Sequence, residues 1–529
     1  MVFNMKDKKI IFGQFYTSNI VANFMVDLSL ANKKGRVLEP CFGKGIFIDA
    51  LLEKGFSNIK GYEIDEDNYN FVKKDKKAEF ILSDYLKADI NEKFDLIIGN
   101  PPYVHWNNIN KDIRDLLSEN KFWTKYSNGE WDLLYAFIIW SIEKLKENGE
   151  LIFIVPYNWF NSTYADSLRK YLIDNGQFEV IIHFGEFKLF KDCYPNNIIF
   201  RYRKTKSKNK PLIFVAEFKG RIGFVSQILQ YFREELDKID HKEYEKEDEK
   251  FKVFTMPQFE SKDLWYLATP TEKKIIKRIE DITNNVKLGE HLDIGVGLVS
   301  GYDNAFIVKD IELNDYSESE KHFIYPFLKA KDCKRYVING LSHYILADDI
   351  KSEDELKKYP NIYKKFINNK VGLGKRYMAD SKLWWHWATI RNYDLFKRNL
   401  NKPKIFVPCI DRSLTARYSY TDRACFGSGD VLIIANKNGL KEDMKYILAW
   451  LNSKYVNKWY RIKGSHSGHR IKYTQAYVSK IPLRLIDWKN KSEVRVYNEI
   501  IKEVDDILLG KDNKAEGKID ELFSKLVHL

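Results

Sequence analysis

The stretch Arg36-Val-Leu-Glu-Pro-Cys-Phe-Gly-Lys-Gly-Ile-Phe47 places a short apolar strand, a glycine turn and a helix start in succession. Gly43 and Gly45 allow the backbone to turn sharply and to pass close to a ligand. A strand, turn and helix in this order are typical of doubly wound α/β folds, which bind nucleotides at the carboxyl edge of the sheet. Two glycines alone are weak evidence for a ligand site, so the neighbouring segments are needed to show whether this turn binds a ligand.

Residues 36–203 alternate short apolar runs with amphipathic stretches, which predicts a doubly wound, mostly parallel, seven-stranded α/β sheet of the Rossmann-like type. The predicted strands are Arg36–Glu39, Ile59–Glu63, Phe80–Ser83, Phe94–Ile98, Leu151–Val155, Val180–Phe184 and Ile198–Tyr202. A 3.6-residue period between Leu133 and Leu145 predicts one of the intervening helices. The short connection between the last two strands leaves no room for a crossover helix, so we expect them to pair antiparallel.

The first three predicted strands each end near an acidic residue: Glu39, Glu63 and Asp84. A carboxylate at the end of the second strand typically accepts hydrogen bonds from ribose hydroxyls. Asp84 could accept a hydrogen bond from an adenine amino group, and Tyr85 could stack on the ring. The chain has no complete Gly-x-Gly-x-x-Gly motif and no phosphate-binding Gly-x-x-x-x-Gly-Lys-Ser/Thr loop. The pattern therefore predicts a nucleoside ligand without a pyrophosphate, for which S-adenosyl-L-methionine is the common candidate.

The fourth predicted strand runs through Gly99 into Asn100-Pro-Pro-Tyr103. Two prolines fix φ and lack N–H donors, so the local carbonyls remain available as acceptors. The Asn100 side-chain oxygen and the Pro101 carbonyl could then accept both hydrogens of a planar exocyclic amine and direct its nitrogen at an electrophilic methyl group. Tyr103 offers a face on which the substrate ring can stack. This tetrapeptide predicts methyl transfer to an amine nitrogen.

These segments, in this order, resemble the TaqI-like, gamma-class N6-adenine DNA methyltransferases over essentially the whole chain. The family's N-terminal segment corresponds to Gly13-Gln-Phe-Tyr-Thr-Ser18, where Ser18 stands in place of the family's usual proline. The resemblance implies that S-adenosyl-L-methionine is contacted by Thr17, Glu39, Cys41, Glu63, Asp84, Tyr85, Asn100 and Pro102, beside the turn at Gly43 and Gly45. It assigns the catalytic motif to Asn100, Pro101, Pro102 and Tyr103.

The resemblance also implies a second aromatic wall for a flipped adenine, in the loop before the last predicted strand. That loop reads Gly185-Glu-Phe-Lys-Leu-Phe190, and Phe190 aligns best with the family's aromatic residue. Phe187 remains an alternative because the loop is longer here than in related enzymes. A buried core phenylalanine is the competing interpretation for either residue.

The second half of the chain resembles the family's C-terminal target-recognition domain, for which we expect an α+β fold. We place the catalytic domain at 1–250 and the recognition domain at 251–529, with the boundary at the charge-dense stretch 241–250, interpreted as a solvated linker or surface helix. Residues 485–529 have the pattern of two amphipathic helices. Trp384, Trp385 and Trp387 are expected to serve in packing.

The segment from Lys454 to Arg484 contains eight Lys or Arg, no Asp or Glu, and five aromatic residues. Such a composition can neutralise phosphates while planar groups approach the bases. The residues predicted to contact DNA are Lys458, Arg461, Lys463, His466, His469, Arg470 and Lys472. A solvated basic surface remains an open alternative for each of them.

The whole chain of 529 residues carries a net charge of +13 and a pI near 9.0, which suits a polyanionic partner. A lysine-rich surface from an A/T-biased genome would give the same charge, so charge alone decides little. The five cysteines are scattered and form no Cys-x-x-Cys pair, which predicts neither a metal site nor disulfides. No apolar run approaches membrane-spanning length, so we expect a soluble, cytoplasmic protein. We also expect it to be a monomer.

Together these features predict a site-specific enzyme that methylates N6 of a flipped-out adenine in double-stranded DNA. It would act in a restriction-modification system, with a separately encoded restriction endonuclease as candidate partner, or as an orphan methylase. Methylation of cytosine N4 or of an RNA base remains open on physical grounds. A bifunctional endonuclease-methyltransferase is a further alternative, although only about a dozen residues precede the Thr17 segment. A glutamine methylase is disfavoured by the long basic C-terminal half.

Overall fold

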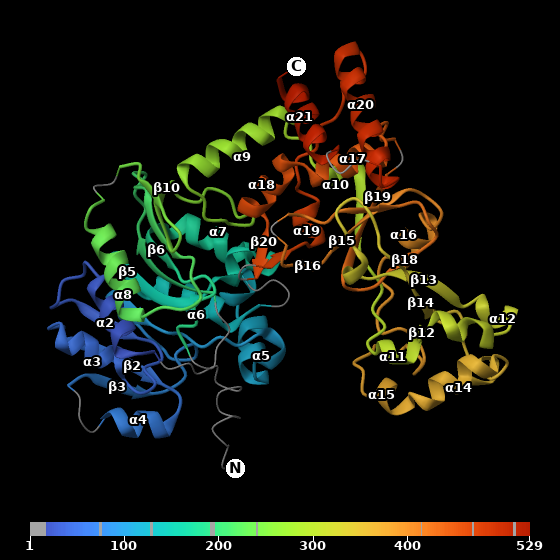
Figure 1. Cartoon of the computed structure of the whole chain (residues 1–529). Coiled ribbons are helices and arrows are strands. Elements are labelled where there is room, and N and C mark those ends of the chain that lie inside the picture. Colours follow the sequence, from blue (N-terminus) through green and yellow to red (C-terminus); the bar gives the residue numbers. More distant parts are fainter. Residues whose placement is uncertain are drawn as a thin grey trace. The chain divides into compact units, whose positions relative to one another are not determined.

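The computed structural model describes residues 17–73, 77–126, 131–190, 196–239, 242–413, 415–437, 439–467, 470–511 and 515–528. The chain divides into two compact units, Met1–Lys273 and Lys274–Leu529 (Figure 1). The boundary lies beyond residue 250, where the sequence placed it, because residues 251–256 form a strand of the first unit's sheet. Each unit is described below by itself.

The first unit is built on one large sheet of ten strands in the order β3-β2-β1-β4-β5-β7-β6-β8-β10-β9. The strands are β1 (Arg36–Glu39), β2 (Asn58–Glu63), β3 (Glu79–Leu82), β4 (Phe94–Gly99), β5 (Leu145–Pro156), β6 (Gly176–His183), β7 (Asn197–Lys204), β8 (Ile213–Phe218), β9 (Glu245–Glu247) and β10 (Phe251–Met256). All seven predicted strands are present, and β6 and β7 pair antiparallel as expected.

Three further strands correct the sequence prediction of a seven-stranded sheet. β8 adds to β6 in parallel, β10 adds to β8 antiparallel, and β9 forms the outer edge. The charge-dense stretch at 241–250 is therefore neither a simple linker nor a helix, because residues 245–247 form this edge strand. Its three exposed, charged residues suit a sheet edge, where unpaired apolar strands would invite aggregation.

Helices cover both faces of this sheet, as Figure 1 shows. The helices are α2 (Asn19–Asp27), α3 (Ile46–Glu53), α4 (Glu66–Lys73), α5 (Lys111–Glu119), α6 (Leu133–Lys144), α7 (Asp166–Asn175) and α8 (Val225–Leu236). Residues of α5, α6 and α7 join one core cluster, whereas residues of α2, α3 and α8 join another. β5 supplies both clusters in alternation: Leu151 and Phe153 face the first, and Ile152 and Ile154 face the second.

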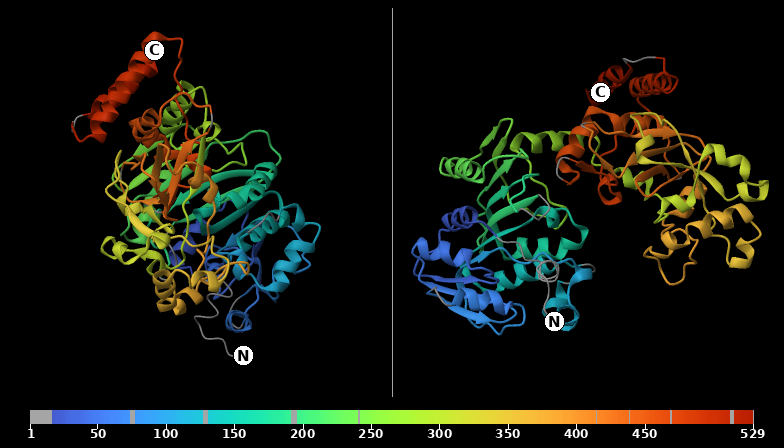
Figure 2. Two further views of the ribbon diagram at one scale, coloured as in Figure 1. Left: turned by 90° about the vertical axis from the view of Figure 1, so that its right-hand side faces the viewer. Right: turned by 60° about the horizontal axis from the view of Figure 1, so that its bottom comes forward.

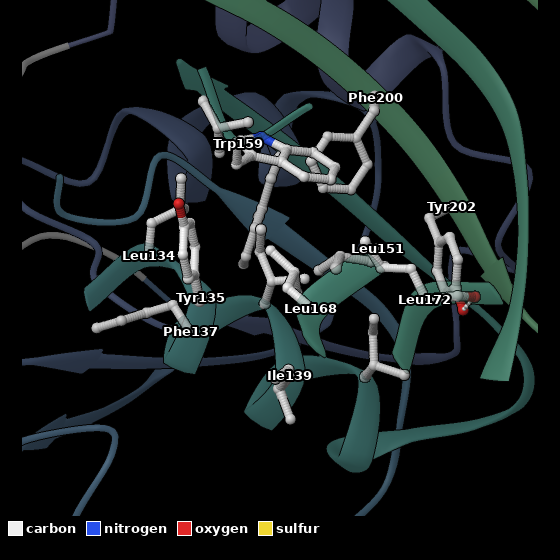
Figure 3. Packing of buried hydrophobic residues seen from close by; sticks show 14 of the residues in the cluster. Leu134, Tyr135, Phe137, Ile139, Leu151, Trp159, Leu168, Leu172, Phe200 and Tyr202 are labelled. Atoms are coloured by element: carbon white, nitrogen blue, oxygen red, sulfur yellow. Dashed lines mark hydrogen bonds between the residues drawn. The ribbon is translucent and has the colours of Figure 1, made fainter. Parts of the chain in front are cut away.

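Figure 3 shows the first cluster around Trp159, a fully buried side chain that follows β5. Its ring meets Phe200 of β7 at 6.2 Å between centroids, while Leu134 and Phe137 enter from α6. Asp132 starts α6 by accepting a hydrogen bond from the Leu134 N–H at 3.0 Å. Burying each large apolar side chain of this kind contributes about 1.5–3 kcal/mol, so the cluster holds the central strands in place.

The second unit has the expected α+β character, with three small sheets. Their strand orders are β11-β19-β15-β17, β12-β14-β13-β18 and β16-β21-β20. The strands are β11 (Leu292–Val296), β12 (Ile307–Val308), β13 (Ile324–Leu328), β14 (Ser342–Ile345), β15 (Lys404–Pro408), β16 (Ile410–Asp411), β17 (Ser419–Thr421), β18 (Phe426–Gly427), β19 (Val431–Asn436), β20 (Ser465–Ser467) and β21 (Arg470–Lys472).

The α-helices of the second unit are mostly short and connect these sheets, after α9 (Pro270–Ile282), which contains the boundary between the units. They are α10 (Leu288–His291), α11 (Asp303–Phe306), α12 (Glu318–Lys321), α13 (Glu353–Leu356), α14 (Pro360–Asn368), α15 (Lys370–Gly374), α16 (Tyr393–Arg398), α17 (Met444–Asn452), α18 (Lys454–Lys463), α19 (Gln475–Val478), α20 (Lys491–Leu508) and α21 (Ala515–His528). The predicted C-terminal helix pair is confirmed as α20 and α21, which lie side by side (Figure 2).

Trp385 and Trp387 are buried in the core of the second unit, and Trp384 packs against the same cluster, as expected. Among the residues that the structure describes, no helix is both long and apolar enough to cross a membrane.

Candidate functional site

The carboxyl ends of β1, β2, β3 and β4 lie side by side because these strands are parallel neighbours. In their register, Glu39 is paired with Gly61 and Glu63 with Leu82. Asp84 follows β3 by two residues, and Asn100 follows β4 directly. The four strand-end segments singled out in the sequence therefore meet at one edge of the sheet, where doubly wound folds bind their ligands.

Glu63 and the glycine turn form one hydrogen-bonded unit. Gly43 and Gly45 both have left-handed φ angles, of 52° and 74°, and Gly45 precedes the first turn of α3. The Gly43 N–H donates to Glu63 Oε2 at 2.7 Å, and the N–H groups of Ile64 and Asp65 donate to Oε1 at 2.9 and 2.8 Å. A carboxylate offers about four acceptor positions, so one remains for a ligand hydroxyl.

The turn and Glu63 thus suit a ribose. Glu63 has one acceptor position left, so it can accept a hydrogen bond from one ribose hydroxyl but not from both at once. Burial raises the pKa of Glu63, while the three N–H donors act in the opposite direction by stabilising its charge. Burial is also the main reason why the pKa of the Cys41 thiol lies well above its ordinary value, and Glu39 and Glu63 add to that shift. Cys41 is therefore a neutral thiol.

Asn100 is held at three points. Its side-chain N–H donates to Thr17 Oγ1 at 3.1 Å, and the Tyr103 hydroxyl donates to Asn100 Oδ1. The same hydroxyl contacts the Ile154 carbonyl of β5 at 2.8 Å, and the Cys41 thiol donates weakly to the Asn100 carbonyl at 3.4 Å. Thr17 and Tyr103 therefore fix the orientation of the Asn100 side-chain amide, while Cys41 contacts the Asn100 backbone carbonyl.

Other predicted cofactor residues occupy different environments. Asp84 is half-buried, burial raises its pKa, and its Oδ1 accepts from the Leu86 N–H at 3.0 Å. Glu39 is only 1% exposed. Tyr85 is 2% exposed, and its ring contacts Tyr62 and Phe137 at 5.8 and 5.5 Å between centroids. The structure therefore places the Tyr85 ring in the core, not on a surface against which an adenine could stack.

The two candidates for the second aromatic wall are both buried. Phe187 and Phe190 are each 6% exposed and belong to the cluster formed with α2, α3 and α8. The Phe187 ring also meets Phe218 of β8 edge-on at 5.5 Å. In this structure both rings are core residues, so a base could stack on either one only after their loop rearranged.

A polar network next to this loop was not recognised in the sequence. The His183 ring, at the end of β6, contacts Glu217 Oε1 of β8 at 3.2 Å and Asn196 Oδ1 at 2.6 Å. It also lies 4.7 Å from the Tyr157 ring, and the Tyr157 N–H donates to the Asn196 carbonyl at 2.9 Å. The network ties β6, β7 and β8 together at the carboxyl edge. No sequence signal could reveal it, because the pairing of β6 with β8 was not predicted.

The basic segment of the second unit divides into exposed and engaged residues. Lys458 and Arg461 on α18 and Arg470 on β21 are exposed, whereas His466 and Lys472 are half-buried. Lys463 instead pairs with Glu280 Oε1 at 2.7 Å, and Trp459 donates to the same oxygen at 3.0 Å. The predicted contact residue His469 lies outside the described residues.

The aromatic residues of this segment mostly build the core. Trp459, Tyr460, Tyr473 and Tyr477 are each at most 5% exposed, and Tyr460 stacks on Tyr473 at 4.7 Å. Only Tyr455 is half-buried, and its ring stacks on Trp450 at 5.9 Å. The expectation that planar aromatic rings of this segment approach bases is wrong for the four buried rings, because their faces are occupied by the protein itself.

Comparison with known proteins agrees with this architecture. The family model of the Eco57I restriction-modification methylase matches residues 27–190, and that of the TaqI-like C-terminal specificity domain matches residues 325–483. The chain is 34% identical over 543 residues to the Type II methyltransferase M.HindII of Haemophilus influenzae, with 98% of each chain covered. It is 36% identical over 249 residues to the Type II methyltransferase M.MjaIV of Methanocaldococcus jannaschii, covering 46% of this chain and 82% of that one.

A solved structure shows the same fold. The Type IIL restriction-modification enzyme MmeI, determined in complex with DNA, matches 100% of this chain and 80% of its own with a TM-score of 0.60 at 14% identity. The strand-end motifs, the two matched domains and the full-length relative lead to one assignment. The chain belongs to the Type II DNA methyltransferases of restriction-modification systems, with a methylase unit followed by a TaqI-like specificity domain.

Proposed function

We propose that this Type II methyltransferase transfers a methyl group from S-adenosyl-L-methionine to N6 of an adenine that has rotated out of duplex DNA. The observation that carries the proposal is the Asn100 amide, fixed between Thr17 and Tyr103 at the end of β4. An amide held this rigidly is preorganised to accept a hydrogen bond from a substrate amine.

The residues present fit the cofactor. S-adenosyl-L-methionine supplies an electrophilic methyl group when bound. Glu63 has one acceptor position left for a ribose hydroxyl, and its three backbone donors keep the Gly43 turn in shape for close approach. The half-buried Asp84 carboxylate is available to an adenine amino group beside them. The neutral Cys41 thiol offers no competing nucleophilic thiolate at this edge.

Asn100 Oδ1 and the Pro101 carbonyl would accept the two amine hydrogens and so orient the amine, and the bound cofactor would supply the methyl group for the nitrogen lone pair. Thr17 and Tyr103 already hold the Asn100 side-chain amide, so its orientation is set before a substrate arrives. The Tyr103 ring, anchored through its hydroxyl to Asn100 and to the Ile154 carbonyl, offers the face for the base.

Duplex DNA must open for this chemistry because the adenine amino group is inaccessible inside the stacked helix. In the second unit, the exposed Lys458, Arg461 and Arg470 are suited to phosphates or base edges. The restriction-modification context of the family supports a separately encoded endonuclease as a partner, and we propose that the chain acts as a monomer.

Methyl transfer from labelled S-adenosyl-L-methionine to duplex DNA, RNA and protein, followed by nucleoside analysis, tests the proposal. Label is expected in duplex DNA, as N6-methyladenine, with the wild type and not with Asn100→Ala. Label recovered as N4-methylcytosine, or only in RNA, would contradict it. Incubation of plasmid with Mg²⁺ should give no cleavage, and cleavage would favour a bifunctional enzyme.

A further inference from the structure

Helix α5, the next α-helix after the catalytic motif (Figure 1), carries an arginine that the protein itself does not engage. Asn110 begins the helix by accepting a hydrogen bond from the Ile113 N–H at 3.0 Å, and the Arg114 N–H donates to the Asn110 carbonyl at 3.1 Å. The Arg114 side chain is half-buried, and its Nε is shielded from solvent. That side chain forms no hydrogen bond or ion pair with any residue that the structure describes.

An arginine in this state is costly for the free protein. A guanidinium is always charged and offers five N–H donors, and a shielded donor without an acceptor loses its hydrogen bond to water without replacement. The other half-buried arginines in the described part of the first unit, Arg201 and Arg203, both pair with Glu179. Arg114 therefore differs from them, and its acceptor is expected to come from outside the chain.

The carboxylates of α5 itself are not placed to serve Arg114. Its neighbours on the helix surface lie three and four positions away, and none of them is acidic: Asn110, Lys111, Leu117 and Ser118. The acidic residues of the helix are one, two and five positions away and point to other sides: Asp112, Asp115 and Glu119. Lys111 is exposed and has no ion pair within the described ranges. The Arg114 side of α5 is therefore positive and suits an anion.

The chain keeps α5 near the catalytic motif. Seven residues, from Val104 to Asn110, separate Tyr103 from the first residue of the helix. Even when fully extended they would span roughly 25 Å, which is less than one turn of duplex DNA. Val104 and Ile109 are buried in one core cluster, which fixes both ends of this connection. A duplex whose target base reaches Asn100 therefore brings its phosphates within range of α5.

We propose that Arg114 binds a backbone phosphate of the substrate DNA within one helical turn of the target adenine. The guanidinium fork matches two phosphate oxygens, and phosphates accept most of the hydrogen bonds that proteins donate to DNA. The inference rests on the proposed function, because it assumes that a duplex delivers its adenine to Asn100. It gives the methylase unit a DNA contact of its own, separate from the basic segment of the specificity domain.

The test compares Arg114→Met and Arg114→Lys with Arg233→Met in the full chain. Methionine is unbranched and favours helices, so the first variant removes the charge and keeps much of the shape. Arg233→Met removes the same charge from the same unit, at an arginine that already pairs with Asp27 at 2.6 Å. Binding isotherms are measured at several salt concentrations on a duplex that contains the recognition site.

Arg114→Met should weaken binding by about tenfold to a hundredfold, the range for losing one hydrogen bond to a charged group. It should also reduce the slope of log K against log salt by about 0.9. Arg114→Lys should keep the slope and lose part of the affinity, because lysine retains the charge without the fork. Arg233→Met should match the wild type in both quantities.

A series of duplexes, each with one neutral methylphosphonate in place of a phosphate, identifies the contact. One such replacement within a turn of the target adenine should weaken binding of the wild type and have no further effect on Arg114→Met. The thermal midpoint of free Arg114→Met should equal or exceed that of the wild type, because the variant no longer shields an N–H without an acceptor.

Equal affinities and equal salt slopes for Arg114→Met and the wild type would overturn the proposal. A lower thermal midpoint together with an unchanged salt slope would overturn it in favour of a structural role for Arg114. A wild type that binds DNA through Arg114 but leaves no methyl group on adenine would instead refute the proposed function and retain the phosphate contact.

Discussion

The carboxyl edge of β1–β4 and the basic segment around α18 were both predicted from sequence to be functional, but they differ in structure. At the sheet edge, Thr17, Cys41, Asn100 and Tyr103 come together in one network. In the basic segment, the residues have different environments. Lys458 and Arg461 are exposed, whereas Lys463 forms an ion pair with Glu280 and most of the aromatic rings are buried in the core.

The difference has a physical origin. A motif at a strand end is positioned by the backbone, since parallel neighbours bring their carboxyl ends to the same edge whatever lies between them. A basic, aromatic composition carries no such constraint, because burial decides which side chains are available and burial depends on distant partners such as Glu280. Motifs tied to sheet topology are therefore more informative than composition.

The largest effect is expected at Asn100. Asn100→Ala removes the fixed acceptor and should lower methyl transfer by at least about a hundredfold, the range for loss of one preorganised catalytic group. Single-turnover kinetics measures the loss, and calorimetric titration should show that the cofactor still binds. Near wild-type turnover would remove Asn100 from the catalytic assignment.

The next largest effect is expected from substitution of Glu63. Glu63→Ala leaves the N–H groups of Gly43, Ile64 and Asp65 without their acceptor and should weaken cofactor binding by about 1–3 kcal/mol. Glu63→Gln keeps one acceptor oxygen and should fall between the alanine variant and the wild type. Unchanged affinity in the calorimetric titration of Glu63→Ala would make this carboxylate purely structural.

A matched pair of variants tests the division within the basic segment. Replacing Lys458 and Arg461 with Gln should reduce the slope of log K against log salt by nearly two, about 0.9 for each phosphate that the protein no longer neutralises. Lys463→Gln should leave that slope unchanged, because Lys463 is already paired with Glu280. Binding isotherms at several salt concentrations give both slopes. Equal slopes for the double variant and the wild type would identify α18 as solvated surface.

The smallest effect concerns pH. Burial acts to lower the pKa of His183, but its contacts with Glu217 and Asn196 outweigh burial and raise the pKa above 6.5. A folded-state pKa above the unfolded value stabilises the protein fully below pH 6.5, and this stabilisation is lost as the pH rises through the folded pKa. The difference in thermal midpoint between the wild type and His183→Gln should therefore shrink above that pH. A constant difference from about pH 6 to about pH 9 would contradict this linkage.

Much of the methylase fold could be predicted because its strands are apolar runs of ordinary length and its helices are periodic. The predicted boundary at 250 and the predicted number of strands were wrong for the same reason. The sequence does not show that β8 pairs with β6 or that β10 pairs with β8, so neither strand was assigned to the methylase sheet. The same gap concealed the His183–Glu217 contact, which exists only because β6 lies beside β8. The burial of Tyr85 was equally unpredictable, because it depends on α6 covering that face.

We propose that Asn100 and its neighbours direct a methyl group to adenine N6 in a specific DNA sequence. Long-read sequencing of DNA from a host that expresses this chain tests the claim most directly, with Asn100→Ala as the matched control. We predict N6-methyladenine at one position of a single recurring sequence, and its absence in the control. Modified cytosine at that sequence, or a modification that persists with Asn100→Ala, would contradict the claim.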